Sequence, residues 1–480
     1  MASKALARGV KFPVATLLFV GSILFLSPVP ASAQAGNSSR NSQSLACPAV
    51  DLNYDFSTDI HAVQEFDAAV GELFRQERFT ELDCIAESLR SSKARFSGGA
   101  SKLHIFYPGV SEPEGHATDE DWKEHLEHAQ RWVAAKPKSI TAQVALAESY
   151  ASYAWYARGE STSDTVTGSG WKLFGQRLDK AKEILDEASS LEQKCPEWYA
   201  VMQEVALGQG WEIARETALF EGAIAFDPSY YQFYRNHALF LAPQWNGGEG
   251  ESAQFAQTVA DRVGGKQGDL LYFEIAIQLV CRCEDPQFAR MSWPRVQSGY
   301  AEVERRYGVS LSNLNQFALM AIKARDPEVA DGIFKRLGDN WDKGTWGSEA
   351  FFTSNKKWAA DIAPAEARFR RLREASEANL KTAEGQRFKK DFDLKFAKFM
   401  EPCVQGAGGD LNKFEMMIEV NKDGGVQNLS ANNMTAVAGC LFENLMQTER
   451  KKEKVFPKPP QPDYWVVLEV DPSSFLVASK

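Results

Sequence analysis

The sequence predicts a mainly α-helical fold, an extended body of stacked helix pairs followed by a small C-terminal α+β domain. Apolar residues recur three and four positions apart from Phe66 onward, as in Val70, Leu73 and Phe74, which is the spacing of amphipathic helices. After about Phe399 the pattern changes to short apolar runs typical of strands. The chain of 480 residues is also longer than one hydrophobic core usually serves, so we expect more than one core.

Residues 1–33 have the order of a bacterial secretory signal peptide. Lys4, Arg8 and Lys11 precede an apolar run from Val14 to Leu26, and Ala31-Ser32-Ala33 supplies the small residues of a cleavage site. The run is about 13 residues, shorter than the roughly 20 that cross a membrane. We therefore expect cleavage after Ala33, a periplasmic or secreted protein, and no transmembrane segment in the mature chain. The alternative is an uncleaved anchor helix.

Residues 34–46 are rich in Asn, Ser and Gly and lack apolar periodicity, which predicts a flexible leader. Loss of the three basic residues of the signal would change the formal net charge from −10 to −13. An acidic protein repels phosphate backbones, so nucleic acid is an unfavourable partner. Export to an oxidising compartment favours disulfides among the seven cysteines, and their odd number leaves at least one unpaired.

A weak internal repeat lies within the helical body, for which we expect residues 47–398. Three prolines each precede a helical segment and each has an alanine ten positions further on; the pairs are Pro137 with Ala147, Pro196 with Ala206, and Pro228 with Ala238. The interval from Pro196 to Pro228 is 32 residues, close to the roughly 34 of a tetratricopeptide unit. Small alanines would let paired helices approach closely. The repeat therefore predicts a tetratricopeptide-like α-solenoid, against the alternative of an irregular helical domain.

Equal offsets from these prolines predict a ligand groove. Residues eleven positions on are Glu148, Leu207 and Leu239, and residues seven positions on include Gln203 and Arg235. Because residues four apart stack on one helix face, both sets should line the inner surface of the first helices. Glu148, Gln203 and Arg235 would supply polar contacts, and the two leucines apolar ones. The alternative is ordinary core leucines beside ordinary solvated polar residues.

Four distinctive segments carry a resemblance to a known group of proteins. They are Ala154-Trp155-Tyr156-Ala157-Arg158-Gly159, Cys195-Pro196-Glu197-Trp198-Tyr199, Asp227-Pro228-Ser229-Tyr230-Tyr231 and Pro243-Gln244-Trp245-Asn246-Gly247-Gly248-Glu249-Gly250. Together they resemble a family of exported bacterial proteins classified as a domain of unknown function with a tetratricopeptide-like body. The resemblance covers roughly Phe66 to Phe352 and implies a fold and a compartment, without catalytic residues.

Residues 399–475 predict a second domain with the order strand, strand, helix, strand. Phe414 to Val420 and Val426 to Ser430 form two strands around the Asp423-Gly424 turn, Met434 to Met446 has helical spacing, and Tyr464 to Val470 alternates as a last strand. This order, with Asp423-Gly424-Gly425-Val426 and Phe456-Pro457, resembles the C-terminal domain of TonB. The uncleaved anchor and long proline-rich spacer of TonB proteins are not visible here, which places an energy-transducing role in doubt.

Cys403 and Cys440 could bridge this small domain. The bond would close a loop of about 37 residues and stabilise the domain by roughly 3–4 kcal/mol, mainly by restricting the unfolded chain. The alternative is two buried thiols, and export favours the bridge.

The search for chemical motifs yields no catalytic residue, no metal site and no cofactor. His125 and His128 lie three apart on one predicted helix, but surface histidines on a charged helix are commoner than ligands, and the H-E-x-x-H order is absent. Gly247-Gly248-Glu249-Gly250 does not follow a strand, so we expect a loop that lets Trp245 turn inward. Tryptophans at helical spacing, Trp132 and Trp155 among them, are expected in the inter-helix core.

The sequence thus predicts a non-enzymatic scaffold of the cell envelope. Its helical groove would bind a peptide or protein partner, and the C-terminal domain would bind another envelope protein. The alternative is an envelope enzyme whose catalytic groups come from distant segments and form no motif.

Overall fold

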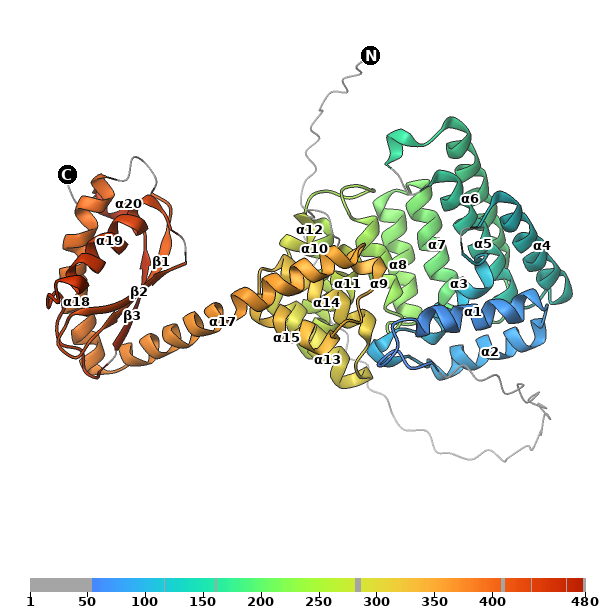
Figure 1. Cartoon of the computed structure of the whole chain (residues 1–480). Helices are drawn as coiled ribbons and strands as arrows, with labels where there is room; N and C mark the ends of the chain where they lie inside the picture. The colour runs from blue at the N-terminus through green and yellow to red at the C-terminus, as the bar shows by residue number, and fades with distance from the viewer. Residues whose placement is uncertain are drawn as a thin grey trace, which may run out of the picture. The chain divides into compact units, whose positions relative to one another are not determined.

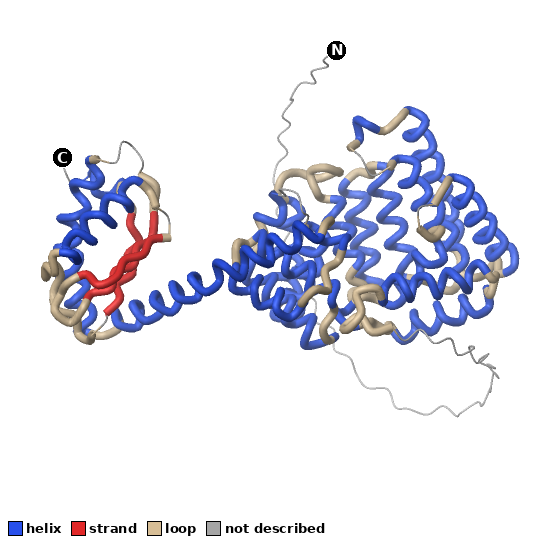
Figure 2. The backbone as a smooth tube through the Cα atoms, in the orientation of Figure 1, coloured by secondary structure: helices blue, strands red, loops and turns tan. Residues whose placement is uncertain are grey.

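The computed structural model describes residues 54–115, 117–159, 162–280, 286–406, 411–432, 434–462 and 464–477. The expected signal peptide and leader, residues 1–46, lie outside these ranges. The described residues form a mainly helical chain with a small antiparallel sheet near its C-terminal end (Figure 1, Figure 2). The predicted mainly α fold with a C-terminal α+β region is therefore confirmed. In the described ranges, no helix combines the length and apolar character needed to cross a membrane.

The body begins with paired helices that continue to the long helix α17. In chain order they are α1 (Ala62–Arg75), α2 (Phe79–Ser92), the short 3-10 helix η1 (Ser97–Gly99), α3 (Lys102–Ser111), α4 (Asp119–Ala135), α5 (Ile140–Arg158), η2 (Ser163–Thr165), α6 (Gly168–Ala188), α7 (Pro196–Gln209), α8 (Ile213–Phe226), α9 (Gln232–Phe240), α10 (Glu251–Val263), α11 (Gly265–Leu279), α12 (Pro286–Ala289), α13 (Trp293–Tyr307), α14 (Leu311–Lys323), α15 (Pro327–Leu337), α16 (Lys343–Trp346) and α17 (Glu349–Leu380).

Alternate helices of the body form a row. α3 packs against α5, α5 against α7, α7 against α9, α9 against α11, and α11 against α13. The intervening helices α4, α6, α8 and α10 pack against this row, as can be followed in Figure 1. Ala147, Ala206 and Ala238 are all fully buried in α5, α7 and α9. The burial of these three alanines agrees with their expected place between packed helices.

Local signals in the sequence start the helices of the row. Ser139, two residues after Pro137, caps α5 by accepting a hydrogen bond from the Ala142 amide at 3.0 Å. Pro196 occupies the first turn of α7, where a missing N–H leaves no helical hydrogen bond unmade. The start of each helix fixes which residues face the next helix in the row.

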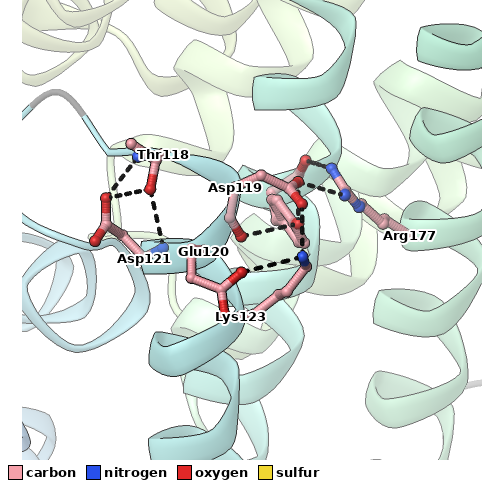
Figure 3. Close-up of polar contacts among 7 residues, drawn as sticks. Thr118, Asp119, Glu120, Asp121, Lys123 and Arg177 are labelled. Carbon is pink, nitrogen blue, oxygen red and sulfur yellow. Dashed lines mark hydrogen bonds and ion pairs between the residues drawn. The ribbon is translucent and has the colours of Figure 1, made fainter.

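The N-terminus of α4 ties three helices together (Figure 3). Thr118 and Asp121 form a reciprocal capping box, with Thr118 Oγ1 accepting from the Asp121 amide at 3.3 Å. Asp119 accepts a hydrogen bond from the Tyr153 hydroxyl of α5 and lies 3.4 Å from Nη2 of Arg177 in α6. Arg177 also donates to the Tyr153 carbonyl at 2.7 Å. These contacts fix the C-terminal half of α5, which carries residues of the candidate site.

The C-terminal region has a core of its own. Its elements are α18 (Ala383–Gln405), β1 (Phe414–Val420), β2 (Val426–Ala431), α19 (Ala436–Arg450), β3 (Tyr464–Val470) and α20 (Ser473–Val477). The strand order is β2-β1-β3 with both pairings antiparallel. The expected boundary at residue 399 falls inside α18, because Phe388, Phe392 and Phe396 already belong to this second core. α18 thus packs with the sheet and with α19 as part of the same unit.

The hairpin turn forms as its sequence predicts. Asn421 accepts hydrogen bonds from the amides of Asp423 and Gly425 at 3.0 Å each. Gly424 has φ of 90°, and a Cβ there would lie 2.2 Å from the Phe456 carbonyl oxygen, so both conformation and space require glycine. Cys403 of α18 and Cys440 of α19 are joined by a disulfide, the pair expected from the sequence.

Candidate functional site

A cavity of about 390 Å³ lies against the row of alternate helices. Residues from α3, α5, α7, α9, α11 and the loop after α9 line it. The lining residues are His104, Glu148, Trp155, Glu197, Ala200, Val201, Gln203, Glu204, Leu207, Gln232, Asn236, Leu239, Trp245 and Gln278. The volume falls within the roughly 300–1,000 Å³ of small-ligand sites. The cavity is therefore large enough for a small molecule or for one side chain of a partner.

The equal-offset prediction places four of its residues together in this cavity. Glu148, Gln203, Leu207 and Leu239 all line it. They meet because α5, α7 and α9 are successive neighbours in the row. Their surroundings differ from an open groove, since Glu148 and Gln203 are only 7% and 2% exposed. The two leucines are half-buried at the cavity wall.

Arg235 departs from the expected set, since it is not among the lining residues. Its guanidinium donates to the carboxylate of Glu274 in α11, with Nε 3.0 Å from Oε2. Glu274 is 2% exposed, and a buried carboxylate requires a cation or several donors nearby. Arg235 therefore pairs with Glu274, 39 residues further on, and this contact joins α9 to α11.

Three glutamates supply the acidic character of the cavity. Burial raises the pKa of Glu148 well above its usual value, and Glu197 and Glu204 add repulsion. Burial also raises the pKa of Glu204 to about 7, with Glu112 and Glu197 contributing and a hydrogen bond from Trp155 opposing. Glu204 therefore exchanges its proton near neutral pH, and Glu148 keeps its proton to a higher pH than a surface glutamate does.

Glu197 is held in place by two neighbours. The Tyr230 hydroxyl donates to its Oε2, and Nδ1 of His104 lies 3.0 Å from its Oε1. Burial and the adjacent Glu197 raise the pKa of Tyr230 well above its usual value, so this phenol keeps its proton and remains a donor. Glu197 thus has a fixed orientation.

Two oxygens at the cavity lack a partner within the described part of the chain. They are Oε2 of Glu148 and Oε1 of Gln203, both buried. Gln203 cannot exchange its amide ends freely, because its Nε2 donates to Glu216 Oε1 and to the Phe233 carbonyl, each at 3.2 Å. Both of those partners accept hydrogen bonds, which leaves the Gln203 oxygen as an acceptor without a donor.

Two tryptophans form an aromatic wall. The rings of Trp155 and Trp245 meet edge to face with centroids 5.5 Å apart. The glycine-rich loop turns Trp245 toward the cavity as expected, and a Cβ on Gly247 would lie 2.1 Å from the Leu241 carbonyl oxygen. Trp155, expected in the core, is instead half-buried and lines the cavity, whereas Trp132 is fully buried.

The two histidines considered for a metal make separate polar contacts. His125 is buried, its Nε2 lies 3.1 Å from the Val110 carbonyl, and burial lowers its pKa to about 4. His128 lies 3.3 Å from Glu77 instead. Across the described ranges, no group of three or more His, Cys, Asp or Glu residues could hold a metal ion.

Sequence reasoning missed Glu197, Glu204, His104 and Trp245 as members of one site. Glu197 and Glu204 lie seven apart on α7, and residues seven apart share a helix face, so this signal was present in the sequence. The approach of His104 depends on packing across 93 residues and left no local signal.

Comparison with protein-family models, with curated proteins and with solved structures finds no match to this chain.

Proposed function

We propose that this chain is an exported interaction scaffold of the cell envelope, which binds a peptide or protein partner at the row of α5, α7 and α9. The carrying observation is that Glu148, Leu207 and Leu239 line one cavity, and each lies eleven positions after a proline at or before the start of α5, α7 or α9. Stacked repeats are expected to place residues at equal offsets on a common surface. The resemblance to exported tetratricopeptide-like proteins supports the same assignment.

The cavity offers a partner both apolar and polar contacts. Leu207 and Leu239 form an apolar wall, and Gln232 and Asn236, joined by a hydrogen bond of 2.7 Å, bring side-chain amides to the same surface. Tetratricopeptide-like arrays bind extended segments on the inner surface formed by their first helices. One side chain of such a segment would enter the cavity, and its backbone would lie along α5, α7 and α9.

The C-terminal region serves as the accessory binding domain in this proposal. β2 is an edge strand, and Gln427 and Asn428 on it are exposed. Its ββαβ order resembles the C-terminal domain of TonB, and a free strand edge can pair with a segment of another envelope protein. The proposed periplasmic or secreted location rests on the signal-like sequence of residues 1–33, and the Cys403–Cys440 disulfide supports it.

Selection of peptides on the purified protein tests the scaffold function. Peptides enriched from a random library should bind the wild-type protein and lose at least about tenfold in affinity with Leu207→Trp, which fills the cavity. The matched control is Ile213→Trp on the exposed start of α8. Failure to enrich any peptide, or equal affinity for both variants, would contradict peptide binding at this surface.

A second candidate function is an enzyme of the envelope. It is favoured by the raised pKa values of Glu148 and Glu204, because a protonated carboxyl in a cavity can act as a general acid. A protonated and an ionised carboxyl beside an aromatic wall would suit glycoside hydrolysis. Release of reducing ends from envelope glycan fragments, abolished by Glu204→Gln, would establish this function. The absence of turnover would remove it.

A further inference from the structure

We propose that the cavity binds a cationic nitrogen group, an ammonium or guanidinium, through the carboxylates of Glu148, Glu197 and Glu204. Its natural source under the proposed function, on which this inference rests, is a lysine or arginine side chain of the partner. A free amine has the same chemistry and is distinguished by experiment.

The charge of the lining is one-sided. Three glutamates line the cavity, and the described lining residues include no lysine or arginine. His104 is already occupied by Glu197, with Nδ1 3.0 Å from Oε1. Glu112, near the cavity, adds negative charge that acts on both Glu148 and Glu204. Within a folded protein such a cluster costs stability through repulsion, and a bound cation would relieve it.

The buried oxygens without a partner favour a ligand that donates hydrogen bonds. Glu148 Oε2 and Gln203 Oε1 are buried acceptors with no partner in the described ranges. A buried polar atom without a partner lowers stability, and a ligand with N–H groups would recover that loss. A ligand that offers only acceptors would leave the Gln203 oxygen without a donor. Ammonium and guanidinium groups carry three and five N–H donors and no acceptor, so they match this arrangement.

The aromatic wall favours positive charge as well. Arg158 already lies with its guanidinium 5.7 Å from the ring centroid of Trp155 and 5.7 Å from that of Trp245. Arg158 is not among the residues that line the cavity. The indole pair therefore attracts cations in this protein, and the electrostatic attraction of an indole face for a cation strengthens away from water.

Binding of a cation should release protons. At pH 7 the folded protein holds protons on carboxyls whose pKa is raised, and a nearby positive charge favours the ionised form. The titratable groups that line the site are His104 from α3, Glu148 from α5, and Glu197 and Glu204 from α7. Glu112, which follows α3, acts on Glu148 and Glu204 through its charge, and the Tyr230 hydroxyl donates to Glu197. Affinity should therefore rise with pH through about 7.

Calorimetric titration of the mature protein with blocked single residues tests the inference. The probes are N-acetyl-lysine methylamide, its arginine analogue and the uncharged norleucine analogue. We expect the two charged probes to bind at least about tenfold more tightly than norleucine. The measured enthalpy at pH 7 should depend on the ionisation enthalpy of the buffer, because protons leave the protein on binding.

Variants locate the effect at the named carboxyls. Glu148→Gln and Glu204→Gln keep size and remove charge, and each should reduce lysine affinity at least about tenfold and diminish proton release. Glu221→Gln on the exposed face of α8 is the matched control and should change neither. Melting temperatures report whether each variant folds, so a loss of binding in a folded variant is attributable to the site.

The outcomes separate this inference from the scaffold function. Equal binding of lysine and norleucine, or lysine binding unchanged in both glutamate variants, overturns cation recognition while peptide binding can stand. Binding of charged probes and of 1,5-diaminopentane without any peptide binding supports cation recognition and removes the peptide scaffold. Selected peptides whose affinity falls on acetylation of one lysine support both together.

Discussion

Two buried side-chain amides in the helical body show the difference between a structural polar group and a site. Asn315 of α14 makes all four of its hydrogen bonds: Nδ2 donates to the Leu311 and Asn340 carbonyls, and Oδ1 accepts from the Asp342 amide and Trp346 Nε1. Gln203 of α7 makes its two donor bonds and leaves its oxygen without a partner. Both residues are at most 2% exposed.

Burial alone therefore does not identify a functional residue in this protein. Asn315 fixes the segment between α15 and α16 through its bonds to Asn340, Asp342 and Trp346. Gln203 faces a cavity, and the carboxyl of Glu148 opposite has an unpartnered oxygen as well. The two residues differ in whether every donor and acceptor has a partner. Selection for stability alone would give a buried polar atom a partner or remove it.

The largest effect is expected for His237→Leu, which tests the donor side of Gln203. Nδ1 of His237 hydrogen-bonds to Glu216, the fully buried carboxyl to which Gln203 also donates. Removal of one partner from a buried ionisable pair costs about 3–5 kcal/mol. Denaturant unfolding measures the loss. A cost below about 1 kcal/mol would show that Glu216 does not hold the Gln203 side chain. The orientation of the Gln203 oxygen would then no longer be determined.

Asn315→Leu should cost about 3 kcal/mol in the free energy of unfolding. The substitution leaves the Asp342 amide and the Trp346 indole N–H without acceptors and the Asn340 carbonyl without a donor. Thermal and denaturant unfolding check the value, and ligand binding at the cavity should be unchanged. A loss of binding in this variant would show that the surroundings of Asn315 and the cavity are not independent.

Gln203→Met should cost less, about 1 kcal/mol. The variant loses two donor bonds, while the orphaned oxygen, which had no partner to lose, disappears. Affinity for a lysine probe should fall in the same variant. If Gln203→Met proves as destabilising as Asn315→Leu, the amide at position 203 is structural and the comparison fails.

The effect of Glu204→Gln depends on pH, and solvent screening of this half-buried side chain keeps it the smallest of the four. The folded pKa of about 7 exceeds the unfolded value of 4.5, so the folded state binds more protons between these values. Wild-type stability should therefore fall as pH rises from about 4.5 to about 7. The variant should melt about 2 °C higher than the wild type at pH 8 and equally at pH 4. A parallel pH profile for both proteins would exclude Glu204 as the titrating group.

The sequence by itself determined the elements whose signals are local. β1 and β3 have the bounds expected from their apolar runs, and the hairpin forms where Asp423-Gly424 predicted it. α7 starts at Pro196, one of the three prolines expected to precede a helix, and the cap of α5 at Ser139 lies two residues beyond Pro137. These features depend on neighbours within a few residues, so their physical causes are all present in the segment itself.

The tertiary structure decided which polar residues meet and what each of them lacks. Periodicity placed Glu148, Gln203, Leu207 and Leu239 on one face, but it contained no information that Arg235 would be drawn to Glu274. His104 and Trp245 also line the cavity, although neither lies at one of the repeat offsets. Burial, charge repulsion and an unpartnered oxygen are properties of a packed assembly, because each depends on atoms brought together from distant parts of the chain.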